Sequence, residues 1–254
     1  GQLKSGIDGL DELVGGGIER GTSVLLAGPA GIGKSSLALR YARAAADRGG
    51  RAAIFAFDER MDTILGRSAG LGMDLGPAIE AGRVTVQQVD PAEMSPGEFA
   101  DSVRGAAEGR DGLPPAEVVI IDSLNGYLNA MPEERFLVIQ LHELLTYLGH
   151  KGVVTFVILA QHGLIGTSLE SPIDTTYLAD SVILLRYFES AGEIRQAISV
   201  LKKRSGWHER TIREFRMGED GIRLGGPLRE FDGVLSGTPV YRGSVGLLPR
   251  PADG

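Results

Sequence analysis

Cysteine is absent from this 254-residue chain. Disulfide bonds and thiolate chemistry are therefore excluded, and the composition suits a reducing compartment. No apolar run approaches the roughly 20 residues that a membrane-spanning helix needs, and the first residues lack the basic and apolar regions of a secretory signal. We therefore expect a cytoplasmic protein with no membrane partner.

An excess of basic charge is also missing, because the formal net charge is -7. No global positive field is available to hold nucleic acid, so a nucleic-acid partner is not expected, although the charge leaves room for a local basic patch. The histidines show no HExxH or other metal-ligand spacing. No Gly-x-Ser-x-Gly sequence appears either, so nucleophilic hydrolysis by serine has no support.

The strongest positive feature is residues 28–35, which fit the phosphate-binding pattern of glycine, four free positions, glycine, lysine and serine or threonine. The apolar run 23–27 before it suits a buried strand, and residues 36–46 after it favour a helix. Loop N–H groups and the positive helix end would point at phosphate oxygens. A glycine-rich turn that binds nothing is the alternative, which the register and the flanks disfavour. The residues expected to bind nucleotide here are Gly28, Ala30, Gly31, Ile32, Gly33, Lys34, Ser35 and Ser36.

Further along, apolar runs of strand length alternate with helical patterns, which predicts a mostly parallel sheet flanked by helices, an α/β fold. The expected parallel strands are 51–57, 84–89, 118–121 and 153–159. After Asp180 the alternating segments 182–188, 194–202, 211–217 and 222–224 predict an antiparallel extension at the C-terminal side. One principal domain is expected over 1–240, with a flexible tail over 241–254.

Residues 136–148 have apolar side chains at helical spacing, and we expect these to pack in the core. They are Phe136, Leu137, Ile139, Leu141, Leu144, Leu145 and Leu148.

Acidic residues follow two of the expected strands. Asp122 ends an apolar strand, as in a second phosphate-site motif whose carboxylate helps to hold Mg²⁺. Asp58 and Glu59 follow residues 52–57, and a carboxylate there could orient or deprotonate the attacking water. They could equally be solvated acids that begin the next helix. Lys34 is expected at the β and γ phosphates, and the Mg²⁺ ligands are expected to be Ser35, Asp58 and Asp122.

A basic cluster over residues 202–208 holds the only tryptophan. Strand alternation places Lys202 and Arg204 on one side. Cations at a subunit boundary could reach a neighbour's γ phosphate and stabilise the transition state. A solvated basic strand end and a small nucleic-acid patch are the alternatives.

Taken together, these segments resemble the KaiC family within the RecA-like P-loop ATPases. The resemblance runs from Ser5 to about Pro239 and is carried by residues 5–13 and 15–18, the phosphate loop, residues 55–59 and residues 201–215. Residues 227–231 and 235–239 are similar to the end of the second KaiC repeat. The resemblance therefore implies a single KaiC domain like the C-terminal half of a two-domain protein, and the start at Gly1, inside motif-bearing sequence, fits a fragment.

The resemblance implies a homohexameric ring with Mg-ATP between subunits, slow hydrolysis to ADP and, in clock members, self-phosphorylation. Asp58 and Glu59 match the paired catalytic glutamates of the family, and the shorter Asp58 gives Glu59 more weight as the base. Residues of the basic cluster match those that reach the neighbour's nucleotide. The resemblance thus favours the trans-acting interpretation for Lys202, Lys203, Arg204, Trp207 and His208.

Three more assignments come from the resemblance alone. Leu71 stands where the second domain of clock members has an aromatic residue near the adenine. Gln161 stands where RecA-like ATPases often have a polar γ-phosphate sensor. Thr175 and Thr176 are the equivalents of the phosphorylated Ser-Thr pair.

The expected function is therefore that of a KaiC-like ATPase in signalling or clock-like regulation, with regulatory protein partners. One alternative is a RecA- or RadA-like recombination ATPase that binds DNA. The other is an ATP-gated scaffold with little turnover.

Overall fold

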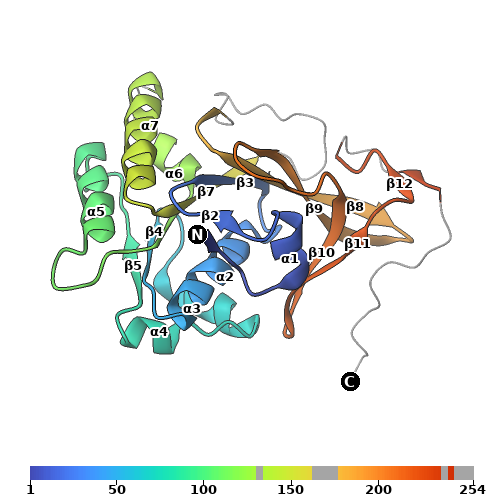
Figure 1. Ribbon diagram of the computed structural model, residues 1–254, viewed down its shortest axis with the longest axis horizontal. Coiled ribbons are helices and arrows are strands. Elements are labelled where there is room, and N and C mark those ends of the chain that lie inside the picture. Colours follow the sequence, from blue (N-terminus) through green and yellow to red (C-terminus); the bar gives the residue numbers. More distant parts are fainter. Residues whose placement is uncertain (130–133, 162–176, 236–239, 243–254) are drawn as a thin grey trace.

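The computed structural model describes residues 1–129, 134–161, 177–235 and 240–242. Its centre is a nine-stranded sheet with the order β11-β10-β9-β8-β3-β7-β6-β4-β5 (Figure 1). The six strands from β8 to β5 in that order pair in parallel, whereas β9, β10 and β11 pair antiparallel. The strand bounds are β3 Ser23–Pro29, β4 Ala52–Ala56, β5 Val84–Gln88, β6 Val118–Asp122, β7 Val154–Gln161, β8 Ser181–Ser190, β9 Glu193–Lys203, β10 Ile212–Gly218 and β11 Gly221–Pro227.

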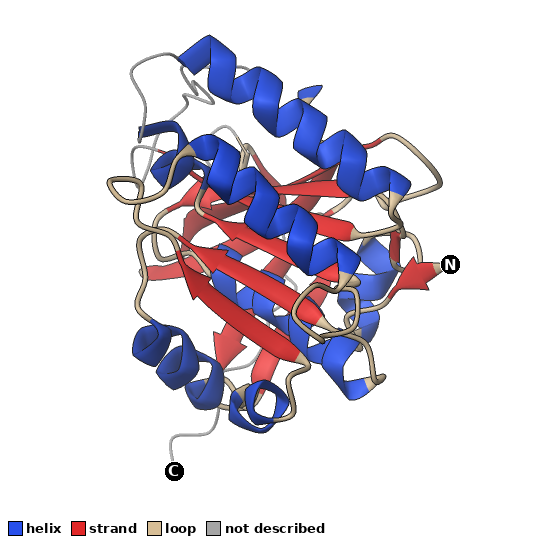
Figure 2. Cartoon of the chain, turned by 90° about the vertical axis from the view of Figure 1, so that its left-hand side faces the viewer, coloured by secondary structure: helices blue, strands red, loops and turns tan. Residues whose placement is uncertain are grey.

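Helices cover both faces of the parallel strands (Figure 2). One hydrophobic core contains side chains of α1, α2 and α3, and the other contains side chains of α5, α6 and α7. Since β3 is buried along its whole length between these cores, it has the continuous apolar sequence of a strand covered on both faces. The helix bounds are α1 Asp8–Leu13, α2 Lys34–Asp47, α3 Met61–Gly70, α4 Gly76–Glu80, α5 Pro96–Glu108, α6 Leu124–Asn129 and α7 Glu134–His150.

The parallel register brings the ends of four strands to one edge of the sheet. Pro29 of β3 pairs with Gln161 of β7, and Ala56 of β4 pairs with Asp122 of β6. The Phe57 N–H donates to the Asp122 carbonyl oxygen at 2.7 Å, which ties the exit of β4 to the end of β6. This carboxyl edge is where open α/β sheets bind their ligands.

The predicted α/β architecture is confirmed, including the antiparallel strands at the C-terminal side. The expected strand over 222–224 is longer, because β11 continues past Gly225 and Gly226, where its register with β10 shifts, and pairs again at Pro227 opposite Arg213. These glycines carry no side chains that could extend an alternating pattern.

The prediction that all seven apolar residues of α7 pack in the core is wrong for two of them. Phe136 and Ile139 are 59% and 57% exposed, whereas the five leucines are buried. At about 100° of rotation per residue, both side chains point away from the leucine face. The apolar pattern is therefore wider than the surface that α7 buries.

Two small strand pairs lie outside the main sheet. β1 (Gln2–Leu3) pairs with β2 (Ile18–Glu19), and β12 (Phe231–Asp232) pairs with β13 (Val240–Tyr241). β13 includes Tyr241, one residue beyond the expected domain boundary, and its ring lies 5.0 Å from that of Phe231. In the described part of the chain, no helix combines the length and the apolar character needed to cross a bilayer.

Candidate functional site

The phosphate loop joins the end of β3 to the start of α2, as its sequence predicts. Gly31 and Gly33 have φ angles of 77° and 109°, which L side chains rarely adopt. Gly33 is the N-cap of α2 and has no side chain to cap it. The first N–H groups of a helix lack partners within the helix. This end of α2 is therefore suited to an anion.

The strands beside the loop hold its shape. The Gln196 side chain of β9 donates to the Ile32 carbonyl oxygen at 3.3 Å. A Cβ at Gly28 would lie 2.6 Å from the Leu185 carbonyl oxygen, so only glycine fits at this exit from β3. Met217 and Phe215 of β10 lie against Gly33. The contacts of Leu185, Met217 and Phe215 were not predicted, because these residues are far from the loop in sequence.

Lys34 lies at the first position of α2 and is 6% exposed. Its ammonium group donates to the carbonyl oxygens of Gly28 and Pro29 at 2.8 and 2.6 Å. Burial lowers the pKa of Lys34 to about 8, and Asp122 acts in the opposite direction. A buried cation that has only neutral carbonyl oxygens as hydrogen-bond partners would be better satisfied by phosphate oxygens.

Ser35 and Asp122 lie together, as the two phosphate-site motifs predict. The Ser35 hydroxyl lies close enough to the Asp122 carboxylate to influence its pKa. Burial raises the pKa of Asp122; the Ser35 hydroxyl opposes this shift, Glu59 adds to it, and Arg67 and Lys34 oppose it. A hydroxyl and a carboxylate are the hard oxygen ligands that Mg²⁺ prefers, so this pair fits the ion. Among the described residues, no group of three or more His, Asp or Glu side chains is arranged to hold a metal.

Asp58 and Glu59 occupy the turn between β4 and α3. The Ser123 hydroxyl donates to Asp58 Oδ2 at 3.0 Å. Both carboxylate oxygens of Glu59 are bound by the guanidinium of Arg67, with 2.7 Å between Nη2 and Oε2. Helix α3 begins only at Met61, so the two acids precede it. Ser123 and Arg67 were not predicted; Arg67 lies eight residues from its partner, a separation that leaves no local sequence pattern.

Gln161 ends β7, directly beside the start of the phosphate loop. Its Oε1 is buried and finds no hydrogen-bond partner among the described residues. The neighbouring Ala160 is fixed by Asn125, which donates to its carbonyl oxygen at 3.0 Å and accepts from its N–H at 2.8 Å. The geometry thus leaves a polar group of Gln161 near the loop, where a sensor side chain is expected.

Leu71 caps the C-terminus of α3 and is partly buried against the core that contains α2. The tip of the β10–β11 hairpin reaches it, since a Cβ at Gly221 would lie 3.6 Å from the Leu71 carbonyl oxygen. The same hairpin supplies Met217, which covers Gly33. Leu71 and the phosphate loop are therefore linked by this hairpin.

The basic cluster lies at the opposite end of the parallel strands from the phosphate loop, where β3 and β8 begin. Lys203 at the end of β9 pairs with Ser181 at the start of β8, and Ser181 pairs in parallel with Val24 near the start of β3. The phosphate loop follows the far end of β3, about 20 Å away at the rise of an extended strand. Lys202 to His208 are thus far from the phosphate loop of their own chain.

Lys202 and Arg204 contact two consecutive residues that precede β8. Lys202 Nζ donates to the Ala179 carbonyl oxygen at 2.9 Å. The Arg204 guanidinium lies 3.3 Å from Asp180 and is 62% exposed. Asp180 Oδ2 also accepts from the N–H and the hydroxyl of Ser23, at 2.9 and 3.1 Å. Asp180 therefore connects the start of β3 to Arg204.

Lys203 points the other way and is 2% exposed. Its ammonium lies 3.0 Å from the Glu19 carboxylate and donates to the Val14 carbonyl oxygen at 2.6 Å. These contacts tie β9 to the segment between α1 and β2, which is a structural role within its own chain. We therefore omit Lys203 from the nucleotide site proposed below.

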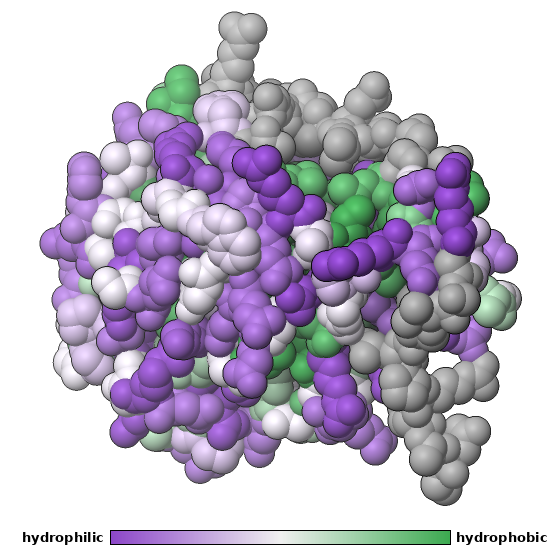
Figure 3. Space-filling model, turned by 45° about the vertical axis from the view of Figure 1, so that its right-hand side comes forward, coloured by the Kyte–Doolittle hydropathy of each residue, from purple (hydrophilic) through white to green (hydrophobic). Residues whose placement is uncertain are grey.

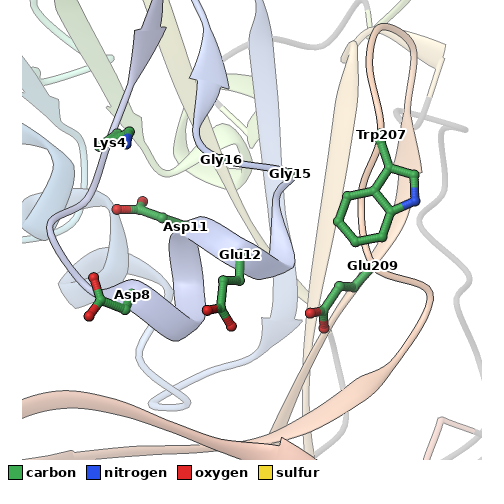
Figure 4. A pocket seen from close by; sticks show the side chains of 8 residues that line it. All are labelled: Lys4, Asp8, Asp11, Glu12, Gly15, Gly16, Trp207 and Glu209. Atoms are coloured by element: carbon green, nitrogen blue, oxygen red, sulfur yellow. The ribbon is translucent and has the colours of Figure 1, made fainter.

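Trp207 is 67% exposed, and the pKa of His208 is lowered by burial and by the Arg210 and Lys203 cations. Trp207 borders a pocket of about 570 Å³ on the side of α1 (Figure 4). The other lining residues are mostly acidic: Lys4, Asp8, Asp11, Glu12, Gly15, Gly16 and Glu209. The basic cluster is thus flanked by an acidic pocket. Thr175 and Thr176, the predicted phosphorylation sites, lie outside the described residues.

Comparisons with known proteins agree with this geometry. The family model of the KaiC ATPase matches residues 3–228. The circadian clock protein KaiC3 of Synechocystis sp. (strain ATCC 27184 / PCC 6803 / Kazusa) is 28% identical over 242 residues, which cover 94% of this chain and 46% of that protein. The circadian clock oscillator protein KaiC of Thermostichus vulcanus is 26% identical over 239 residues, with 94% and 45% coverage.

This chain spans somewhat less than half the length of these curated relatives. The match extends from β1 to the end of β11 and includes both the phosphate loop and the basic cluster. The chain belongs to the KaiC family and is a KaiC ATPase domain.

Proposed function

We propose that this domain binds Mg-ATP at the carboxyl edge of its sheet and hydrolyses it slowly. The observation that carries the proposal is the convergence of Lys34, Ser35, Asp122 and Glu59, which come from three separate segments of the chain. The cations Lys34 and Arg67 and the carboxylates of Asp122 and Glu59 interact with one another close to the N-terminus of α2, which has no side-chain cap. Such a set of charges suits a triphosphate with its Mg²⁺.

Each residue has a defined task in this proposal. The N–H groups of Gly31 to Ser36 cradle phosphate oxygens, and Lys34 leaves its two carbonyl partners to bind the β and γ phosphates. Bound Mg²⁺ supplies neutralising charge, with Ser35, Asp122 and Asp58 as its candidate protein ligands. Glu59 orients or deprotonates the attacking water, and Gln161 contacts the γ phosphate. Leu71 lies on the adenine side.

We further propose that a second subunit completes the site. Lys202, Arg204, Trp207 and His208 are separated from the phosphate loop of their own chain by the length of β3. A head-to-tail neighbour would bring them to a nucleotide. Hydrophobic surface interrupts hydrophilic surface on the face of the molecule that Figure 3 shows. Beside and within the basic cluster, Leu201 and Trp207 are exposed, which supports a contact there.

Replacement of Lys34 by alanine tests the proposed ATPase. We expect Lys34→Ala to lose ATP hydrolysis and to weaken ATP binding at least about tenfold, because the ammonium to phosphate contacts are lost. Isothermal titration with Mg-ATP and phosphate release measure the two effects. The control is Lys151→Ala, since Lys151 is an exposed lysine at the end of α7. Equal ATP binding and turnover in wild type and Lys34→Ala would contradict the proposal.

A homohexameric ring, self-phosphorylation and a clock or signalling role with regulatory partners are the finer parts of the proposal. They rest on the family and on the names of the relatives. Native mass spectrometry with Mg-ATP tests the ring, and phosphopeptide mapping tests Thr175 and Thr176. Tight ATP binding with no measurable phosphate release would instead favour an ATP-gated scaffold. DNA-stimulated turnover that falls with salt would favour the recombination ATPase.

A further inference from the structure

Arg67 grips the carboxylate of Glu59 with both terminal nitrogens. The contact is bidentate, with Nη1 on Oε1 and Nη2 on Oε2, the latter at 2.7 Å. The side chains of Arg67 and Glu59 are 28% and 29% exposed, so the pair is shielded from much of the solvent screening that weakens surface ion pairs. Bidentate arginine–carboxylate pairs fix the orientation of the carboxylate as well as its position.

The surroundings of Glu59 and Arg67 also favour this contact. The Gln88 side chain of β5 donates to the Glu59 carbonyl oxygen at 3.2 Å, which holds the backbone of the turn. Arg67 Nε is buried and finds no hydrogen-bond partner in the part of the chain that the structure describes. Glu59 is therefore the group that anchors this guanidinium on α3.

The pair also lies inside the proposed catalytic centre. Glu59 and Arg67 both act electrostatically on Asp122, in opposite directions, together with Lys34. Arg67 is thus a cation of the centre itself, although neither of the two phosphate-site motifs contains it.

We propose that Arg67 is a positioning residue that holds the Glu59 carboxylate in the orientation needed to direct the attacking water. This inference rests on the proposed ATPase function. A carboxylate has about four lone-pair positions, and the arginine fork uses two of them, so the others stay open to water. A free glutamate side chain would sample several rotamers, and a displacement of about 1 Å in a reacting group can cost about 100-fold in rate.

The test is a double-mutant cycle of Arg67→Gln and Glu59→Gln in the full chain. We expect Arg67→Gln to lower kcat about tenfold while the Kd for Mg-ATP changes less than about twofold, because Arg67 acts through Glu59 and not on the nucleotide. In the Glu59→Gln background, Arg67→Gln should lower kcat no further. A second cycle, on the urea midpoint of the nucleotide-free protein, should also be non-additive, since the two side chains contact each other directly.

Arg60→Gln is the matched control. Arg60 follows Glu59 in sequence and caps α3, but it pairs with Asp62 at 3.6 Å and its side chain is 80% exposed. It should keep wild-type kcat and Kd.

Three results would overturn the inference: an unchanged or higher kcat in Arg67→Gln, an equal loss in both backgrounds, or a Kd that weakens in step with kcat. An inactive wild type would instead refute the proposed ATPase. The urea cycle would then still report whether the two side chains are coupled.

Discussion

At the scale of the residue, Gly33 shows how tightly the phosphate loop is specified. Its φ of 109° disfavours any side chain, and an added Cβ would collide with the thioether of Met217 and lie 3.2 Å from Phe215 Cε1. The glycines of the motif were recognised for their backbone freedom alone. In the structure, Met217 and Phe215 of the antiparallel strand β10 also pack against the loop.

We predict that Gly33→Ala weakens Mg-ATP binding at least about tenfold and lowers the free energy of unfolding by about 1–3 kcal/mol, because both the backbone and the Met217 contact are strained. Calorimetric titration and urea unfolding measure these effects. The control is Gly66→Ala in α3, where nothing lies within 4 Å of the added methyl group. It should raise stability by up to about 1 kcal/mol through helix propensity. Tight nucleotide binding by Gly33→Ala would contradict this account.

The residues of the site divide by how far apart their partners lie in sequence. Lys34, Ser35 and Asp122 were predictable, because each belongs to a short motif at a strand end. Ser123 and Arg67 were not, since their importance comes from the single carboxylates that they touch. Lys203 lies inside the predicted basic cluster, yet strand alternation turns it into the protein interior.

At the scale of the element, α5 begins with a complete capping box. The Glu98 N–H donates to Ser95 Oγ at 3.3 Å, and the Ser95 N–H donates to the Glu98 carboxylate at 2.8 Å. This second bond is the main reason why the pKa of Glu98 is lowered. Pro96 at the first helical position adds a preset φ angle. Together these groups fix where the helix starts.

We predict that Ser95→Ala lowers the free energy of unfolding by about 1 kcal/mol, since it removes one cap bond and loosens the other. ATP turnover should stay unchanged, because α5 lies on the sheet face opposite α2. Ser102→Ala, in the middle of the same helix, is the matched control and should be neutral or slightly stabilising. Urea unfolding with turnover assays distinguishes the two variants. An equal stability loss in both would rule out the capping explanation.

Most elements of the sheet were predictable from hydrophobic pattern. The bounds of α5 were not predicted, although Ser95 and Glu98 are the sequence signal of its capping box. Alternation and apolar runs report which side chains are buried, so they identify β4, β6 and β8 well. They fail where burial is partial. Phe136 and Ile139 extend the stripe of α7 beyond the surface that it covers, and β11 continues through two glycines.

At the scale of the whole molecule, mixing subunits tests whether the phosphate loop of one subunit and the basic cluster of its neighbour form one site. We predict that Lys34→Ala and Arg204→Ala each form assemblies with little turnover and that mixed assemblies recover activity. In a random equal mixture, about one quarter of head-to-tail interfaces combine an intact Lys34 with an intact Arg204 from the neighbour. Phosphate release from dissociated and reassembled mixtures measures this recovery. Mixed assemblies, verified by native mass spectrometry, that remain inactive would contradict a shared site, as would full turnover by isolated subunits.

The phosphate loop and the basic cluster lie at opposite ends of β3, so each subunit has two different ends. In an open row of such subunits, one terminal loop receives no cations from a neighbour, and at the other end one set of cations meets no nucleotide. Closing the row matches both ends at once, whatever the number of subunits. In the proposed assembly, ATP therefore links successive subunits. Opening one interface between subunits inactivates the nucleotide site at that interface and leaves the other sites complete.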